Sequence, residues 1–120
     1  MSTSVLIVDD HAAFRAAARR MLEQSGFSVV GEAENASAAL EAIRALRPEI
    51  VLLDIQLPDM DGIEICRHLA EEGEMPVIVL TSIREREVYG SRLAESPARG
   101  FISKLELSGS AVAALVSQSA

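Results

Sequence analysis

The sequence predicts an α/β fold: a five-stranded parallel sheet with five helices on its two faces. Three short apolar runs at 5–8, 50–53 and 77–80 are rich in β-branched residues, which is typical of strands buried on both sides. Between such runs the apolar residues recur at helical spacing, so strands and helices alternate along the chain. Right-handed crossover connections between alternating elements give a parallel sheet covered on both faces.

The five predicted strands are indicated with different strength. In chain order they span 5–8, 27–30, 50–53, 77–80 and 101–102. The second mixes a polar residue into its apolar run, so we expect it at an edge of the sheet, and the fifth is very short.

Apolar stripes of helical period predict the five helices. The stripes cover 14–22, 36–46, 63–70, 88–94 and 112–116. Gly26, Pro48 and Gly73 end the first three helices. The fourth helix, within 85–95, has few apolar anchors among Arg and Glu residues, so we expect it to be the most loosely held and to move.

The composition predicts one cytoplasmic domain spanning 1–120. A formal net charge of -7 disfavours a basic surface for nucleic acid or membrane lipid. No apolar run approaches the roughly 20 residues of a membrane span, and the first residues lack the basic region of a signal peptide. The single cysteine, Cys66, excludes an internal disulfide and a zinc site built on paired cysteines.

Polar side chains follow four of the predicted strands at the point where each strand ends. They are Asp9 and Asp10 after the first strand, Asp54 after the third, Thr81 and Ser82 after the fourth, and Lys104 after the fifth. Lys104 is the only lysine among eleven basic residues. Because ligands bind outside the carboxyl ends of parallel strands, we expect these side chains to meet at one edge of the sheet.

Three carboxylates at one edge require compensation. Two carboxylates about 4 Å apart repel by roughly 4 kcal/mol at an effective dielectric near 20, so protons or a cation must offset them. Oxygen ligands without His or Cys suit a hard cation such as Mg²⁺. Lys104 and Thr81 supply a positive charge and a hydrogen-bond donor for a phosphoryl group, which Asp54 is placed to accept.

Simpler structural roles stay open for each motif on its own. Asp9 and Asp10 with His11 could cap the following helix, the segment 57–62 could be only a turn, and Lys104 could be a surface charge. The joint placement at four strand ends favours the functional interpretation.

These motifs resemble the receiver domain of two-component response regulators over essentially the whole chain. The matching pieces are 5–11, 51–62 with Asp54, Thr81-Ser82 and 100–104. The similarity is greatest to receivers joined to a helix-turn-helix domain of the LuxR or NarL type. Leu105 departs from the pattern, because many receivers have proline after the lysine.

The resemblance implies a flavodoxin-like sheet with strand order 2-1-3-4-5 and phosphorylation of Asp54 by a sensor histidine kinase. The residues it implicates are Asp9, Asp10, Asp54 and the backbone carbonyl of Gln56 for Mg²⁺, Thr81 and Lys104 for the phosphoryl group, Thr81 and Phe101 for switching, and Gln56, Ser82 and Ile83 for tuning hydrolysis. Such a protein promotes only its own phosphorylation and dephosphorylation, without other enzyme activity.

The switch implied by the resemblance repacks the face formed by the fourth predicted helix, the fifth strand and the last helix. It would allow a homodimer to form on phosphorylation and would control transcription through a DNA-binding domain absent from this chain. A stand-alone receiver acting by protein contacts stays open, as does a pseudo-receiver that is not phosphorylated. An aspartyl-phosphate phosphohydrolase is less supported, because Gln56 stands where that class has a second Asp. A flavin-binding module is not supported, because this sequence has no hydroxyl- and glycine-rich phosphate loop after the first predicted strand.

Overall fold

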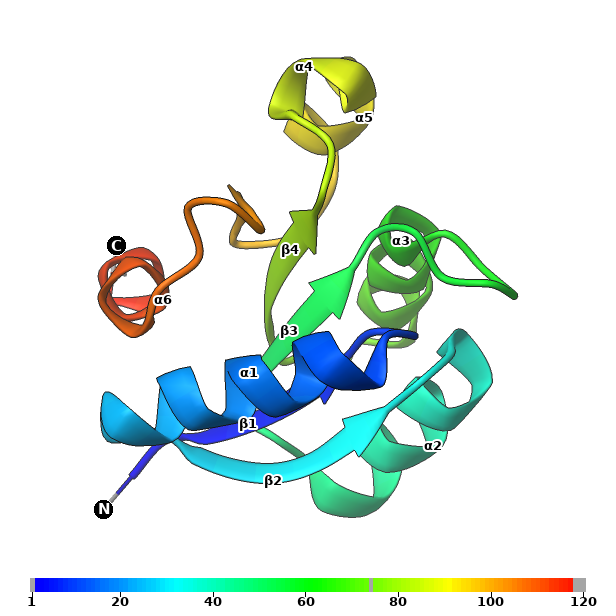
Figure 1. Ribbon diagram of the computed structural model, residues 1–120. Helices are drawn as coiled ribbons and strands as arrows, with labels where there is room; N and C mark the ends of the chain where they lie inside the picture. The colour runs from blue at the N-terminus through cyan, green and yellow to red at the C-terminus, as the bar shows by residue number, and fades with distance from the viewer. Residues whose placement is uncertain (1, 74, 118–120) are drawn as a thin grey trace.

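The computed structural model describes residues 2–73 and 75–117, which form a five-stranded parallel sheet between two layers of helices (Figure 1). The strand order is β2-β1-β3-β4-β5, which confirms the expected topology and the edge position of the second strand. The strands are β1 (Ser4–Val8), β2 (Ser28–Ala33), β3 (Ile50–Asp54), β4 (Val77–Ser82) and β5 (Gly100–Ser103).

Helices cover both faces of this sheet, as the alternating pattern predicted. They are α1 (Ala12–Gln24), α2 (Ala36–Leu46), α3 (Gly62–Glu72), α4 (Arg86–Tyr89), α5 (Ser91–Ala94) and α6 (Gly109–Val116). Buried side chains of α1 and α6 form one core cluster, and those of α2, α3 and α4 form the other. The alternating side chains of β1 supply both clusters, Leu6 and Val8 on one face, Val5 and Ile7 on the other.

The described chain has six helices where the sequence pattern predicted five. The segment 85–95 forms two single turns, α4 and α5, because Gly90 between them has φ 55° and ψ -132°, which no helix contains. Tyr89 is the only residue of the two turns that is buried. The motion expected for this segment stays a prediction.

The second strand is longer than its apolar run indicates. β2 continues to Ala33 because its backbone pairs with β1 as far as Val8, past a shift in register between Val5 and Leu6. Hydrogen bonding to a central strand therefore extends β2 through Glu32, a residue that the apolar pattern excluded.

Gly62 allows the start of α3 to pass close to the end of β3. A Cβ atom at this position would lie 2.5 Å from the carbonyl oxygen of Asp54 and 2.9 Å from the Cα of Ile55. The amide of Gly62 donates a hydrogen bond of 2.8 Å to the Ile55 carbonyl across the same contact. This close approach fixes the loop that follows Asp54.

We predict that Gly62→Ala destabilises the fold, because the new methyl group meets backbone atoms that cannot move aside. Overpacking of this kind costs about 1 to 3 kcal/mol, although alanine favours the helix itself. Urea unfolding measures the change, and Glu64→Ala, on the exposed face of the same helix, is the control. An unchanged or increased free energy of unfolding in Gly62→Ala contradicts the close-contact explanation.

Candidate functional site

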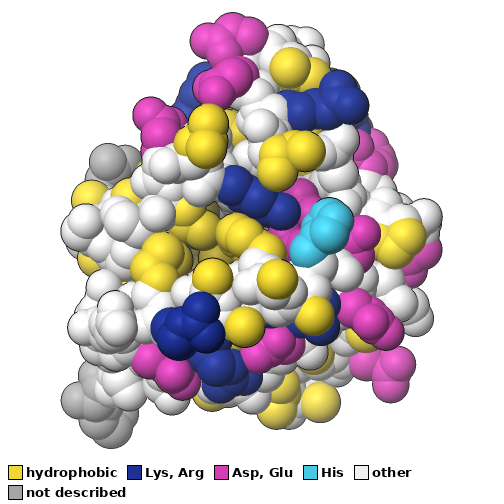
Figure 2. All heavy atoms as spheres, viewed as in Figure 1, with side chains coloured by type: hydrophobic (Ala, Val, Ile, Leu, Met, Phe, Trp, Pro, Cys, Tyr) yellow, Lys and Arg dark blue, Asp and Glu magenta, His cyan; other side chains and the backbone are white. Residues whose placement is uncertain are grey.

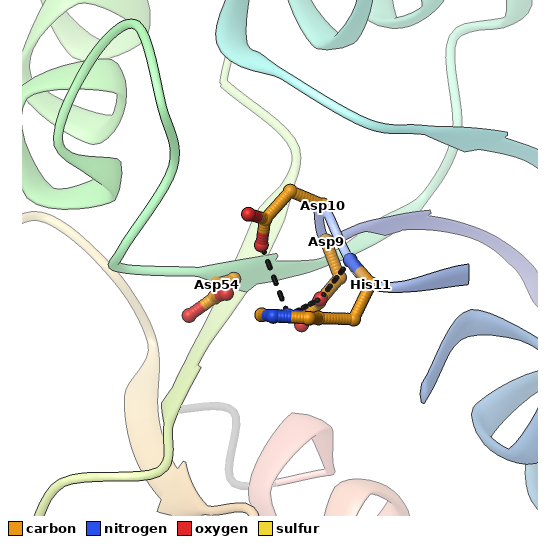
Figure 3. A group of neighbouring side chains, drawn as sticks. All are labelled: Asp9, Asp10, His11 and Asp54. Carbon is orange, nitrogen blue, oxygen red and sulfur yellow. Dashed lines mark hydrogen bonds and ion pairs between the residues drawn. The ribbon is translucent and has the colours of Figure 1, made fainter. Parts of the chain in front are cut away.

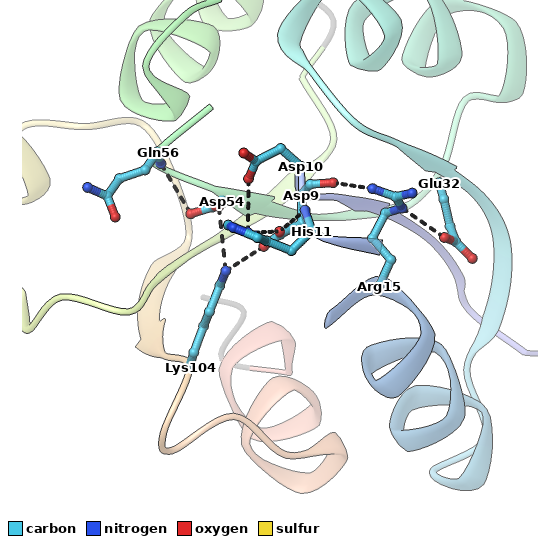
Figure 4. A network of polar contacts seen from close by, with 8 residues as sticks. All are labelled: Asp9, Asp10, His11, Arg15, Glu32, Asp54, Gln56 and Lys104. Atoms are coloured by element: carbon cyan, nitrogen blue, oxygen red, sulfur yellow. Dashed lines mark hydrogen bonds and ion pairs between the residues drawn. The ribbon is translucent and has the colours of Figure 1, made fainter. Parts of the chain in front are cut away.

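The polar side chains that end the strands do meet at one edge of the sheet (Figure 3 and Figure 4). We call this group the strand-end site; it consists of Asp9, Asp10, Asp54, Thr81 and Lys104. Parallel pairing produces the arrangement: Val8 lies opposite Leu53 between β1 and β3, and Asp54 lies opposite Thr81 between β3 and β4. Four strand ends thus bring distant residues together.

Lys104 reaches into the site between two carboxylates (Figure 4). Its Nζ lies 2.6 Å from Oδ2 of Asp9 and 3.5 Å from Oδ2 of Asp54, and its side chain is 12% exposed. The backbone amide of Lys104 donates to the Ser82 carbonyl at 2.9 Å, which ties the start of its loop to β4. The only lysine of the chain is therefore a nearly buried cation, not a surface charge.

Asp54 is a buried carboxylate, 2% exposed, at the end of the central strand. Burial, and next the charge of Asp9, raise the pKa of Asp54 to about 6. The charge of Lys104 and a 3.1 Å hydrogen bond from the backbone amide of Gln56 to Oδ1 oppose this rise. The site therefore holds more negative charge than its single ammonium compensates.

Asp9, Asp10 and His11 form a tight group after β1 (Figure 3). The Nδ1 atom of His11 lies 3.2 Å from Oδ1 of Asp9 and 3.1 Å from Oδ1 of Asp10. The first residue before α1 is His11, which makes no side-chain capping hydrogen bond, and Asp9 instead accepts from the His11 backbone amide at 2.8 Å. Helix capping therefore does not account for these two carboxylates.

The donor atoms fit a hard divalent cation. One ligand atom from each of Asp9, Asp10, His11 and Asp54 lies within 4.8 Å of the others. Carboxylate oxygens are the ligands that Mg²⁺ prefers in proteins, and their mutual repulsion is what such an ion would relieve. Asp9, Asp10 and Asp54 could thus hold Mg²⁺, and the Gln56 backbone adjoins them in sequence.

The two hydroxyls that end β4 differ in their hydrogen bonding. Thr81 is fully buried, and its Oγ1 has no hydrogen-bond partner among the described residues. Ser82, also buried, accepts from the Arg84 amide at 3.0 Å and shares a hydrogen bond of 2.6 Å with the hydroxyl of Tyr89 in α4. One hydroxyl is therefore available to a ligand, whereas its neighbour is tied to a helix.

Phe101, in β5, is buried in this structure, with only 7% of its surface exposed. Its ring centroid is 6.2 Å from that of Tyr89, and the guanidinium of Arg86 lies over the ring at 5.4 Å. Arg86 also donates from Nη2 to the Phe101 carbonyl at 3.1 Å. A cavity of about 140 Å³, lined partly by Phe101, Leu93 and Arg86, adjoins the ring.

Exposed apolar side chains surround the strand-end site. Ile83, Val88 and Leu105, in the segments after β4 and β5, are 70%, 57% and 86% exposed. Figure 2 shows a mixture of hydrophobic, acidic and basic side chains across the face viewed in Figure 1. Gln56 is also exposed, so two of the three positions expected to tune hydrolysis, Gln56 and Ile83, lie at the surface, whereas the third, Ser82, is buried.

Sequence reasoning missed the roles of two aromatic residues. Tyr89 is predicted only as an apolar residue of the stripe 88–94, yet its hydroxyl shares a hydrogen bond with the hydroxyl of Ser82. Phe14 was predicted only as part of a helix stripe, yet Nζ of Lys104 lies 4.3 Å from the centroid of its ring. Periodicity identifies a buried face but not the polar atom that its residues meet, so no pattern in the sequence gave either contact.

Known proteins similar to this chain are regulators. A transcriptional regulator of Pseudomonas aeruginosa is 40% identical over 105 residues, which cover 87% of this chain and 50% of the relative. BvgA of Bordetella pertussis, named as a positive transcription regulator of virulence factors, is 38% identical over 107 residues, covering 88% of this chain and 51% of BvgA. The chain therefore spans about half the length of the curated relatives it matches.

A solved structure supports the same relationship. The signal receiver domain of NarL from Mycobacterium tuberculosis superposes with a TM-score of 0.88 at 30% identity, over 98% of both chains. No described helix is both long and apolar enough to cross a membrane. The family model described as the response regulator receiver domain matches residues 5–115. With a matching model, fold and set of relatives, the chain belongs to the response regulator receiver domains of two-component systems.

Proposed function

We propose that this chain accepts a phosphoryl group on Asp54 from a sensor histidine kinase, with Mg²⁺, and transmits the change through the face formed by α4, α5, β5 and α6. One observation carries the proposal: a buried carboxylate at the end of β3 is paired with an ammonium and lies opposite Thr81, whose buried hydroxyl has no hydrogen-bond partner among the described residues. A phosphoryl group bound to Asp54 supplies the oxygens that Thr81 and Lys104 need as partners.

The transfer needs little covalent chemistry from the protein. An oxygen of Asp54 forms a bond to phosphorus as the bond from phosphorus to the donor nitrogen or oxygen breaks, and the bonding electrons leave with the donor. Lys104 offsets the charge on the phosphoryl oxygens, and Thr81 donates its hydroxyl hydrogen to one of them. Mg²⁺ held by Asp9, Asp10 and Asp54 supplies further positive charge when bound.

The signal then passes through the end of β4. Phosphorylation adds about -1.5 to -2 charge and new acceptor oxygens, which draw the Thr81 hydroxyl toward Asp54. Ser82 follows Thr81 in the chain and shares a hydrogen bond with Tyr89, so a movement of Thr81 also moves α4. Because Phe101 is already buried, its rotation removes little exposed surface, and the Tyr89 contact carries the coupling.

The output of the signal is a separate part of the proposal. The relatives named as transcription regulators are about twice as long as this chain. We therefore propose that an output domain binds DNA, and that phosphorylation favours a homodimer of the receiver. A stand-alone receiver that acts by protein contact is the alternative, and the full reading frame decides between them.

We predict that a small phosphodonor such as acetyl phosphate, together with Mg²⁺, adds one phosphate to the chain at Asp54. Intact-mass analysis detects the adduct, and peptide mapping locates it. Asp54→Ala loses the adduct entirely, whereas Asp10→Asn slows its formation because metal binding is weakened. A wild-type chain without an adduct, or an equal adduct on Asp54→Ala, is incompatible with the proposed function.

We predict that Asp54→Asn stabilises the metal-free chain at neutral pH. The folded pKa of about 6 lies above the ordinary 3.8, so between these values the unfolded chain loses a proton that the folded chain retains. The wild-type free energy of unfolding therefore falls as pH rises through this window, and the variant gains about 1 to 3 kcal/mol above it.

Denaturant unfolding with chelator, from acid to neutral pH, measures this gain. The difference between wild type and Asp54→Asn vanishes below pH 3.8, where the folded and unfolded wild-type chains are both protonated at this position. Asp59→Asn is the matched control: hydrogen bonds from the Ala36 and Ser37 amides lower the pKa of Asp59, so this variant gains nothing. Equal stability of wild type and Asp54→Asn at neutral pH contradicts the charge imbalance.

We predict that Tyr89→Phe uncouples α4 from the strand-end site. Loss of the hydrogen bond to Ser82 costs about 0.5 to 1.5 kcal/mol, and the phosphorylation-induced NMR shifts of residues 86–94 shrink while those around Asp54 remain. A double-mutant cycle with Ser82→Ala measures the coupling energy. Strictly additive variants, with unchanged shifts in α4, would show that this contact transmits nothing.

A further inference from the structure

We propose that Phe14 is a positioning residue for Lys104. The face of its ring holds the lysine ammonium between Asp9 and Asp54, at the place where the phosphoryl group arrives. The inference rests on the proposed function and adds to it a residue that makes no contact with the phosphoryl group itself.

The contact has the geometry of a cation–π interaction. Nζ of Lys104 lies 4.3 Å from the centroid of the Phe14 ring, well within the roughly 6 Å over which such attraction is significant. The lysine side chain is only 12% exposed, so water screens the interaction weakly. The negative face of an aromatic ring then stabilises an ammonium that has lost most of its hydration.

The two carboxylates do not use all of the bonding capacity of the ammonium, so the ring has a side of it to contact. A lysine ammonium carries three N–H donors and no acceptor. The two ion pairs, with Asp9 at 2.6 Å and with Asp54 at 3.5 Å, both lie on the acidic side of the site, and Oδ2 of Asp9 accepts no hydrogen bond from any described residue. The Phe14 ring occupies a further side of the ammonium that would otherwise require water.

No other cation takes over this task in the described part of the chain. Arg15, which contacts the Asp9 backbone, donates from Nη1 to the carbonyl of Asp9 at 2.7 Å and pairs with Glu32 at 3.0 Å (Figure 4). Its guanidinium is thereby directed away from both carboxylates. The ion pair of Asp54 in the described structure is with Lys104 alone.

The ring matters because the ammonium is unequally shared. Lys104 lies 0.9 Å nearer to Asp9 than to Asp54, the difference between 3.5 and 2.6 Å, so electrostatic attraction alone draws it toward Asp9. During phosphorylation the ammonium must instead face oxygens on Asp54. A ring face attracts a cation over a broad area, so Phe14 stabilises it in either position, which a directional hydrogen bond cannot do.

The position of Phe14 in the fold suits this role. It lies in the first turn of α1, which begins directly after the loop that carries Asp9 and Asp10. Its partly buried side chain packs against the core cluster that α1 and α6 form with the central strands, so neighbouring apolar residues support the ring. The same helix start therefore fixes two carboxylates and the aromatic face that stands beside the ammonium.

The single lysine makes the test direct. Selective isotope labelling of lysine gives NMR signals from Lys104 only, and a ring beside the ammonium shifts its ε-methylene protons upfield. We expect this upfield shift in the wild type and in Phe14→Tyr, and its loss in Phe14→Leu, which keeps apolar bulk without a π face. Met21→Leu, which packs against the same core cluster, is the matched control and leaves the shift unchanged.

Phosphorylation by acetyl phosphate and Mg²⁺ supplies the second measurement. We expect Phe14→Leu to slow the reaction about fivefold, while Phe14→Tyr restores the rate to within about twofold of the wild type. An unshifted lysine signal in the wild type, or a Phe14→Leu rate equal to that of the wild type, overturns the inference while phosphorylation of Asp54 still stands. A wild-type chain that is not phosphorylated overturns the proposed function first, and the positioning role with it.

Discussion

Burial of two carboxylates against one ammonium is the constraint on which the rest of the structure depends. Asp9 and Asp54 are almost completely removed from water, and among the described residues Lys104 alone forms an ion pair with both of them. Desolvation and mutual repulsion raise the pKa of Asp54 to about 6, so the metal-free fold carries an unfavourable charge at neutral pH. In the proposed function, a divalent cation held by these carboxylates would offset this cost.

The parallel sheet is what makes such a concentration of charge sustainable. Strands β1, β3 and β4 are buried apolar elements whose ends cannot shift without disturbing the core. The loops that follow them are fixed locally: Gly62 permits the close approach of α3 to Asp54, and the Asp59 carboxylate accepts hydrogen bonds from the first amides of α2. Rigid strand ends and pinned loops hold the like charges in place.

Most of the fold and the members of the site were predictable, because both follow from patterns along the chain. Continuous apolar runs located β1, β3 and β4, and the polar residues after them located the strand-end site. The break at Gly90 was not predicted, because a helical stripe continues across it and only the backbone angles reveal the interruption. Nor were the contacts of Phe14 and Tyr89, because they join segments whose spacing in the sequence carries no period.

The neighbouring hydroxyls of β4 connect the charged site to the surface. Thr81 is buried and has no hydrogen-bond partner among the described residues, a state that costs free energy and that a phosphoryl oxygen would relieve. Ser82 accepts a hydrogen bond from the Arg84 amide and shares one with Tyr89, so in the proposed function a movement of Thr81 reaches α4 through the next residue. Tyr89 in turn lies beside Phe101, whose carbonyl is held by Arg86. In the proposed function, the Thr81 hydroxyl would sense the phosphoryl group, and Ser82 would link it to α4, a single turn in which Tyr89 alone is buried.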